Sequence, residues 1–177
     1  MQPRELLKVL LIEDDAEFAG VLLKTLAERT RPVFNVDVAK SLAEGLSRLA
    51  AGGQDAVVLD LTLPDSEGLE TLTKVRAQGP DVPIIVLTVS DDEALASKAL
   101  QQGAQDYLVK GQADLKYLGR VIRYAIERTS AEEMLRQKQA LEGINRLMMD
   151  RETRIIELKQ EVNALLRQSD QPERYRL

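Results

Sequence analysis

Four short apolar runs in the first 110 residues each lead directly into an acidic, hydroxyl or basic residue. The runs and the residues that follow them are Val9–Ile12 before Glu13-Asp14-Asp15, Ala56–Leu59 before Asp60, Pro83–Leu87 before Thr88, and Tyr107–Val109 before Lys110. Continuous apolar runs of this length are typical of parallel strands that are buried on both faces. Because open α/β sheets build their sites at the carboxyl ends of such strands, we expect three carboxylates, one hydroxyl and one ammonium group to meet at one edge of a sheet.

Amphipathic stretches separate these runs. The first, Glu17–Arg29, places one stripe of side chains on a helical face, namely Phe18, Val21, Leu22, Thr25 and Leu26. Ser41, followed three residues later by Glu44, predicts a capping box at the start of the second helix. That helix would turn four residues inward before ending at Gly52-Gly53, namely Leu42, Gly45, Leu46 and Leu49.

The second half of the pattern has similar boundaries. A loop at Pro64–Gly68 follows the third run, and a helix is expected from there to Gly79-Pro80. Ser90 or Asp91 is expected to cap the next helix, which would end at Gly103.

Five strand–helix units in this order predict an α/β fold, a doubly wound parallel sheet with right-handed crossovers. Val33–Val38 supplies the second strand and Asp106–Val109 the fifth. The flavodoxin-like (βα)5 order, 2-1-3-4-5, places the first and third strands side by side where the strand order reverses. Asp14, Asp15 and Asp60 are expected to meet at that point.

Beyond Leu115 the pattern changes to one long helix whose apolar residues follow a heptad repeat. With Leu141 as position a, the a positions are Leu141, Met148, Ile155 and Val162, and the d positions are Ile144, Arg151, Leu158 and Leu165. A long amphipathic helix usually packs against a copy of itself, so we expect a coiled-coil homodimer, with a four-helix arrangement or a partner coil as alternatives. The chain then divides into a globular domain, 1–128, and a helical dimerisation tail, 129–177, whose helix ends at Pro172 at the latest.

Histidine and cysteine are both absent from the sequence. Without imidazole the chain cannot by itself be a histidine autokinase or a Ser-His hydrolase, and without thiols it has no disulfide and no thiolate metal site. The formal net charge is −5, and residues 131–177 hold nine basic and nine acidic residues, which argues against nucleic acid as the main partner. No apolar run reaches about 18 residues, so we expect a cytoplasmic protein without membrane insertion.

The acids at the predicted sheet edge suit a divalent cation. Asp14, Asp15 and Asp60, with the backbone carbonyl of Thr62, offer the oxygen ligands that Mg²⁺ prefers. Alternatively, Asp14 and Asp15 both cap the start of the following helix. Asp60 is harder to explain in that way, because an acid that ends a fully apolar strand is costly to bury unless it is paired or coordinated.

The same edge carries groups suited to phosphoryl transfer. Asp60 is the candidate nucleophile, whose attack on phosphorus would give an acyl phosphate. Lys110 can pair with Asp60 at rest and with a phosphoryl oxygen afterwards, and Thr88 offers a hydroxyl to another oxygen. Taken alone, Lys110 could equally be a solvated surface charge and Thr88 a strand-end cap, but their combination with Asp60 favours a role in catalysis.

The sequence resembles the receiver domain of bacterial two-component response regulators, including the chemotaxis type. The matching segments are VLLIEDD, VVLDLTLPDSEG, IIVLT and DYLVK, within residues 6–128. The resemblance implies that Asp60 accepts a phosphoryl group from a phosphohistidine on a separate sensor histidine kinase, and that Asp14 and Asp15 serve Mg²⁺. Such a protein is not an enzyme in its own right, although it assists its own phosphorylation and dephosphorylation.

The resemblance also implies a switch. Thr88 would follow the phosphate, Lys110 would contact it, and Tyr107 would swing inward when Thr88 moves. A half-buried tyrosine on an edge strand is the alternative for Tyr107.

Two positions depart from the family pattern. Gly111 stands where a proline with a cis bond is common, and a cis bond before a non-proline residue costs about 3–4 kcal/mol, so we expect a trans bond or a rearranged loop. Val89 stands where a small residue is usual, and we expect it to crowd access to Asp60. Thr62 and Ser90 occupy the two positions that tune loss of phosphate in the family.

The leading functional hypothesis is a phosphorylatable receiver with a dimerising tail that signals through protein–protein contacts rather than DNA binding. The tail resembles linkers beside receiver or PAS modules in sensor kinases, so a detached part of a hybrid sensor kinase is an alternative, as is an inert dimerising scaffold. A phosphatase of the haloacid dehalogenase type would need a second Asp where Thr62 stands. A DNA-binding transcription factor is disfavoured, because a charge-balanced helix leaves little room for a reader module.

Overall fold

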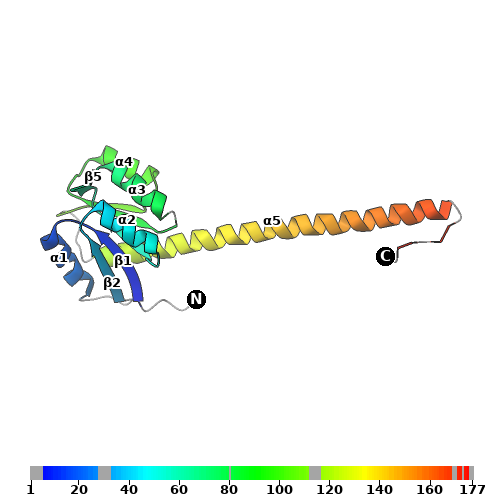
Figure 1. Cartoon of the computed structure of the whole chain (residues 1–177), viewed down its shortest axis with the longest axis horizontal. Coiled ribbons are helices and arrows are strands. Elements are labelled where there is room, and N and C mark those ends of the chain that lie inside the picture. Colours follow the sequence, from blue (N-terminus) through cyan, green and yellow to red (C-terminus); the bar gives the residue numbers. More distant parts are fainter. Residues whose placement is uncertain are drawn as a thin grey trace. The chain divides into compact units, whose positions relative to one another are not determined.

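The computed structural model describes residues 6–27, 33–79, 81–111, 117–168, 171–172 and 174–175. In chain order its elements are β1 (Leu6–Ile12), α1 (Ala16–Ala27), β2 (Val33–Ala39), α2 (Leu42–Ala51), β3 (Ala56–Leu59), β4 (Thr62–Leu63), β5 (Ser66–Glu67), α3 (Leu69–Gln78), β6 (Ile84–Thr88), α4 (Glu93–Gln101), β7 (Asp106–Val109) and α5 (Leu118–Gln168) (Figure 1). The chain forms two compact units, Met1–Ser130 and Ala131–Leu177. Helix α5 therefore begins in the first unit and continues in the second.

The first unit is built on a five-stranded sheet in the order β2-β1-β3-β6-β7. Every neighbouring pair in it is parallel, with Ile12 opposite Leu59, Leu59 opposite Val86, and Thr88 opposite Val109. Counted within this sheet, the order is 2-1-3-4-5, so the flavodoxin-like prediction is confirmed. The carboxyl ends of β1, β3, β6 and β7 consequently share one edge.

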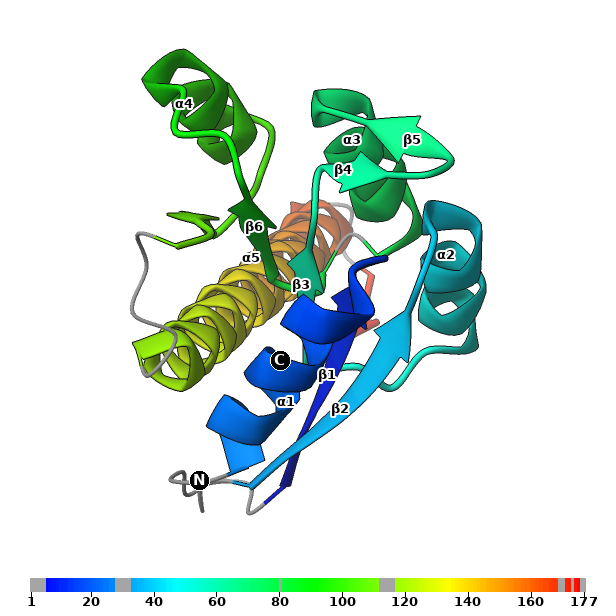
Figure 2. The ribbon, with the colours of Figure 1, turned by 90° about the vertical axis from the view of Figure 1, so that its left-hand side faces the viewer.

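Helices cover both faces of the sheet, with α1 on one side and α2 and α3 on the other (Figure 2). The side chains of α1 and of the first turns of α5 pack on one face, as Leu22 and Ile122 do. Helices α2, α3 and α4 cover the opposite face, where Leu49, Leu72 and Ala99 are buried. Strands β3 and β6 are buried along their whole length, which explains their unbroken apolar sequences.

Helix α1 is rotated relative to the predicted stripe. Its buried residues are Ala19, Leu22 and Leu26, whereas Val21, which the sequence pattern places on one stripe with Leu22 and Leu26, is 51% exposed. Val21 lies about 200° around the helix axis from Ala19, so a helix that buries Ala19 turns Val21 to solvent. The end predicted for this helix at Arg29 lies outside the described residues.

The helix caps are partly as predicted. Ser41 caps α2 by accepting the Glu44 N–H at 3.2 Å, and Gly52 ends the helix with a φ of 73°. For α4, however, the cap is Asp92 rather than Ser90 or Asp91. The Asp92 carboxylate accepts the N–H groups of Ala94 and Leu95, two and three residues later, at 2.8 and 3.3 Å.

The loop after β3 is more ordered than the sequence indicated. Strands β4 and β5 form a short antiparallel hairpin in which Thr62 faces Glu67. At its turn, Asp65 accepts the N–H groups of Leu42 and Ala43 at 2.8 and 2.9 Å, and thereby caps α2 from 22 residues away. This contact fastens the hairpin to the start of α2.

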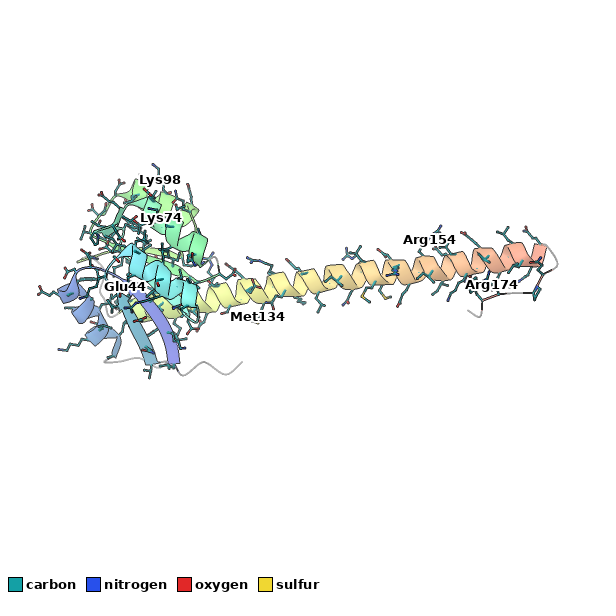
Figure 3. The ribbon with its side chains drawn as sticks, in the orientation of Figure 1. Glu44, Lys74, Lys98, Met134, Arg154 and Arg174 are labelled. Atoms are coloured by element: carbon teal, nitrogen blue, oxygen red, sulfur yellow. The ribbon has the colours of Figure 1, made fainter. Side chains whose placement is uncertain are left out.

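The second unit contains the heptad stretch of α5. The apolar a and d residues are all between 37% and 62% exposed, namely Leu141, Ile144, Met148, Ile155, Leu158, Val162 and Leu165. Met134, one heptad earlier, is 54% exposed and is labelled on the helix in Figure 3. Helix formation here is confirmed, whereas the coiled-coil dimer stays a prediction.

Beyond Gln168, the described residues Arg174 and Tyr175 contact α5. The side chain of Asn163 accepts the N–H groups of Arg174 and Tyr175, both at 3.1 Å, and donates to the Tyr175 carbonyl at 2.7 Å. Asn163 is 1% exposed, and the Lys159 ammonium lies 5.9 Å from the Tyr175 ring centroid. The helix ends before Pro172, as predicted.

Among the described helices, none has an apolar stretch long enough to span a bilayer.

Candidate functional site

Asp60 lies immediately after β3 and is only 4% exposed. Its N–H donates to the Ile12 carbonyl of β1 at 2.9 Å, which fixes the backbone at the centre of the sheet edge. Its Oδ1 accepts the Thr62 N–H at 3.0 Å. The carboxylate is therefore held in place by the chain that immediately follows it.

Lys110 supplies the charge opposite this carboxylate. Its Nζ lies 2.6 Å from Asp60 Oδ2 and 2.6 Å from Glu13 Oε2. The backbone N–H of Lys110 donates to the Thr88 carbonyl at 2.7 Å, which extends the pairing of β7 with β6 by one residue. A surface lysine is excluded, since the side chain is 11% exposed.

The electrostatics of the site follow from burial and from these pairings. Burial is the largest influence on the Lys110 pKa and lowers it, but the hydrogen bonds and charges of Asp60 and Glu13 together outweigh burial and raise the Lys110 pKa overall. For Glu13 burial prevails, and the pKa of this carboxyl is raised in spite of the nearby Lys110. Lys110 is therefore charged at neutral pH, whereas Glu13 is a carboxylate whose charge is costly to bury.

Three acids gather at this edge, namely Glu13, Asp14 and Asp60. One oxygen from each lies within 4.8 Å of the other two. Carboxylate oxygens at such separations are the donors that Mg²⁺ and other hard cations accept, and Asp14 is exposed, which leaves a side open to water ligands. The donor set therefore fits a divalent cation.

Asp15 is not part of this group. Its Oδ1 accepts the N–H groups of Glu17 and Phe18 at 2.9 and 3.0 Å, which makes it the cap of α1. The structure thus assigns to Asp15 the capping alternative and places Glu13 where the sequence analysis had placed the second acid of the pair. Thr62 is close to Asp60 through its N–H, and a role for its carbonyl as a ligand stays a prediction.

Glu13 was missed, although the strand pattern contained a signal. Side chains alternate along a strand, and Ile12 packs on the α2–α4 face while Leu11 packs on the α1 face. The Glu13 N–H donates to the Ala39 carbonyl at 2.9 Å, so the extended backbone continues through Glu13 and its side chain shares the side of Leu11. The same alternation after Val58 and Leu108 places Asp60 and Lys110 on that side.

Thr88 and Tyr107 belong to the opposite side. Thr88 is 2% exposed, and its Oγ1 accepts the Ser90 N–H at 3.4 Å. Tyr107 is half-buried against the α2–α4 core, and its hydroxyl donates to the Ser90 carbonyl at 2.9 Å. Burial raises the pKa of Tyr107. Ser90 therefore contacts both predicted switch residues through its backbone.

The structure describes both residues that depart from the family pattern, Gly111 and Val89. Gly111 has a φ of 83°, a conformation that favours glycine, and residues 112–116 lie outside the described chain. Val89 is 70% exposed, so its side chain extends mainly into solvent.

A flavodoxin-like sheet with an acid cluster and a buried lysine at its carboxyl edge defines the CheY-like class of α/β domains. Residues 9–122 match the response regulator receiver domain family, and the chain belongs to this family.

Curated relatives are similar over the same region. The swarming motility regulation protein RssB of Serratia marcescens is 36% identical over 115 residues, which cover 65% of this chain and 51% of RssB. The transcriptional regulatory protein CusR of Escherichia coli K12 is 32% identical over 115 residues, 65% of this chain and 49% of CusR. The chain thus spans about half the length of these relatives.

Solved structures resemble the first unit. A CheY-like receiver domain from Methanospirillum hungatei has a TM-score of 0.64 at 24% identity, over 72% of this chain and 98% of that one, which shows the fold. A response regulator from Burkholderia pseudomallei, solved with a phosphorylated aspartic acid, a calcium ion and citrate, has a TM-score of 0.58 at 29% identity. That match covers 73% of this chain and 74% of the Burkholderia chain.

Proposed function

We propose that this chain is a phosphoacceptor that takes a phosphoryl group on Asp60 from a phosphohistidine of a sensor histidine kinase. The observation that carries the proposal is a buried carboxylate at the sheet edge, paired with Lys110 at 2.6 Å and grouped with Glu13 and Asp14. The Burkholderia relative, whose structure holds a phosphorylated aspartic acid and a calcium ion, supports this assignment.

The transfer is a displacement at phosphorus. An oxygen of Asp60 attacks, the new O–P bond forms as the N–P bond of phosphohistidine breaks, and the imidazole nitrogen leaves with the electron pair and takes up a proton. Because these 177 residues contain no histidine, the donor imidazole lies outside them. Residues Glu13, Asp14 and Asp60 would hold Mg²⁺, which when bound neutralises charge on the phosphoryl oxygens.

Lys110 acts before and after the transfer. Before it, the ammonium donates to Asp60 Oδ2, which helps to orient this carboxylate. After it, the ammonium pairs with a phosphoryl oxygen, because one aspartyl oxygen now bridges carbon and phosphorus in the acyl phosphate and has little charge. The Thr88 hydroxyl donates to another phosphoryl oxygen, and this new bond draws Thr88 away from its long contact with Ser90.

We further propose that the output passes through protein–protein contacts and that the tail of α5 forms a homodimer. The exposed apolar a and d residues support this, since a stripe of this length on one helix is typical of a coiled-coil seam. Arg151 at a d position is the one charged interruption among the eight positions from 141 to 165. A charged residue at a core position lowers the stability of such a coil, so the dimer is expected to be moderate in affinity.

The test is chemical modification with a small donor. Purified protein is incubated with Mg²⁺ and acetyl phosphate and analysed by peptide mass spectrometry, and a phosphoryl adduct that hydroxylamine removes is expected on the peptide that contains residue 60. Asp60→Asn should abolish the adduct. Asp55→Asn is the matched control, because Asp55 precedes the same strand at its opposite end and its carboxylate accepts the Lys8 N–H.

Oligomer size completes the test. Sedimentation of wild type and Asp60→Asn, with and without beryllofluoride, reports whether the tail dimerises and whether the site influences it. No adduct on residue 60 in wild type would refute the phosphoacceptor proposal. In that event a concentration-dependent dimer that is unchanged by beryllofluoride would favour the scaffold alternative.

A further inference from the structure

The ammonium group of Lys110 is enclosed on three sides. Two sides are the carboxylates of Asp60 and Glu13, each at 2.6 Å. The third is the ring of Phe18, whose centroid lies 4.6 Å from Nζ. This distance is within the range in which the negative face of an aromatic ring attracts a cation.

Phe18 reaches this position because of the way α1 begins. Asp15 caps the helix and accepts the Phe18 N–H itself at 3.0 Å, which fixes the backbone of residue 18 one turn from the acid cluster. The ring is half-buried against the core on the α1 face, the same side of the sheet as Glu13, Asp60 and Lys110. The ring is therefore anchored independently of the charges that it faces.

The ring differs from the two carboxylates in one chemical respect. Carboxylate oxygens that hold a divalent cation have less negative charge to offer a neighbouring ammonium group. An aromatic ring is not a ligand for Mg²⁺, so its attraction for Lys110 is the same whether the acid cluster holds a cation or not.

We propose that Phe18 is a positioning residue for Lys110, keeping the ammonium beside Asp60 when Glu13 and Asp60 share their charge with a bound cation. The proposal rests on the phosphoacceptor function proposed above and extends it to a residue outside the acid cluster. In the phosphorylated protein the ring holds Lys110 within reach of a phosphoryl oxygen. Without the ring, the long lysine side chain has more orientations available, and fewer of them are productive.

Three variants separate positioning from packing. Phe18→Leu keeps an apolar side chain in the core but removes the aromatic face, and Phe18→Tyr restores that face. Phe34→Leu is the matched control, because Phe34 is half-buried against the same core but makes no ring contact with Lys110 among the described residues. Thermal unfolding of all variants identifies any general loss of folding.

The first measurement is the phosphorylation rate at saturating Mg²⁺ and saturating acetyl phosphate. For Phe18→Leu we expect a rate roughly five- to thirtyfold lower, which is the contribution of a desolvated cation–π contact, about 1–2 kcal/mol, at 1.36 kcal/mol per tenfold. Phe18→Tyr should be close to wild type, and Phe34→Leu should change the rate less than twofold. An unchanged rate in Phe18→Leu, or an equal loss in Phe34→Leu, would overturn the proposal.

The second measurement does not depend on phosphorylation. In wild type the side-chain ε protons of Lys110 should show ring-current shifts and nuclear Overhauser contacts to Phe18, and both should persist when Mg²⁺ is added. Loss of these contacts on adding Mg²⁺ would overturn the positioning role even if phosphorylation proceeds. If wild type shows the contacts but takes up no phosphoryl group, the phosphoacceptor function fails while the ring–lysine contact stands.

Discussion

The contact of Asp65 with α2 allows a quantitative prediction about a residue that performs no chemistry. Asp65 receives two backbone N–H groups of the first turn of α2, at 2.8 and 2.9 Å, and both of its carboxylate oxygens take part. Those N–H groups have no partner within the helix, so they depend on Asp65 or on water. Removing the carboxylate in Asp65→Ala loses a capping interaction that is worth about 0.5–2 kcal/mol.

Exposure sets where in that range the effect should fall. Asp65 lies on the surface, where water can replace its carboxylate and where screening reduces the charge contribution. We therefore expect Asp65→Ala to lower the free energy of unfolding by about 1 kcal/mol. Asp65→Asn keeps one acceptor oxygen and should lose about half of that.

The pH dependence has a definite sign. Hydrogen bonds from the N–H groups of Ala43 and Leu42 are the main cause of a lowered pKa for Asp65. A carboxyl whose pKa is lowered by folding stabilises the fold above its unfolded pKa, and that stabilisation disappears as the pH falls through the folded pKa. The difference between wild type and Asp65→Ala should thus be full at pH 7 and should shrink below about pH 4.

The assay is urea unfolding followed by circular dichroism at pH 7 and at pH 3. Glu67→Ala is the matched control, because Glu67 is an exposed acid on the same hairpin and lies opposite Thr62. Its effect should be within about 0.5 kcal/mol. Equal stability of Asp65→Ala and Glu67→Ala at pH 7 would refute the capping argument, and a difference that persists undiminished at pH 3 would refute its electrostatic part.

Three further changes test other parts of the structure. Glu13→Gln removes an acid whose pKa is raised chiefly by burial, so the variant should gain stability relative to wild type as the pH rises above about 4.5. Urea unfolding between pH 4 and 8 without Mg²⁺ measures this difference, and a difference that is constant over the range would contradict the assignment. Gly103→Ala places a Cβ 3.3 Å from Arg76 Nε at a φ of 94°, so it should lower the free energy of unfolding by about 1 kcal/mol or more, measured by thermal unfolding. Gly20→Ala is the control, because its new Cβ meets nothing within 4 Å and should not destabilise the fold. Ile155→Asp at a heptad a position should shift the sedimentation of the proposed dimer to the monomer without changing the melting of the first unit, and an unchanged dimer would show that the seam is elsewhere.

Much of the first unit could be predicted because each signal was local. Buried parallel strands carry their own apolar sequences, and the order of strands and helices leaves few topologies once crossovers must be right-handed. Caps such as Ser41 could be found for the same reason, since the residues that interact are three apart in the sequence.

The errors came from geometry that one-dimensional patterns describe poorly. The sequence pattern favours Asp14-Asp15 as an adjacent acidic pair, but the backbone stays extended through Glu13 and the chain turns before Asp15, which therefore caps α1. Counting the strand alternation one residue further would have selected Glu13. The contact between Asp65 and α2 could not be predicted from the sequence, because no local rule pairs a hairpin turn with a helix 22 residues earlier.

The loop that carries Asp60 is held more firmly than the segment that carries Thr88. Short hydrogen bonds hold the loop after Asp60 at three places. The Asp60 N–H donates to the Ile12 carbonyl of β1 at 2.9 Å, and the Gly68 N–H donates to the Leu61 carbonyl within the loop at 2.8 Å. Asp65 accepts two N–H groups of α2. Within the segment after Thr88, by contrast, the Ser90 N–H to Thr88 Oγ1 and the Asp92 N–H to Ser90 Oγ contacts are both long, at 3.4 Å. A short bond joins this segment to β7, from the Tyr107 hydroxyl to the Ser90 carbonyl at 2.9 Å. Because well-aligned short bonds resist rearrangement better than long ones, a phosphoryl group on Asp60 should displace the Thr88–Ser90 segment first.

That difference predicts the direction of the conformational response. Ser90 accepts the Tyr107 hydroxyl at 2.9 Å, so a shift of Ser90 reaches Tyr107 on β7 and the start of α4, where Asp92 is the cap. Amide hydrogen exchange with and without beryllofluoride should therefore change at residues 89–95 and around Tyr107, and should change little in β4, β5 and the first turn of α2. The reverse pattern, with the hairpin side responding and the α4 side unaffected, would show that the rigidity argument is wrong.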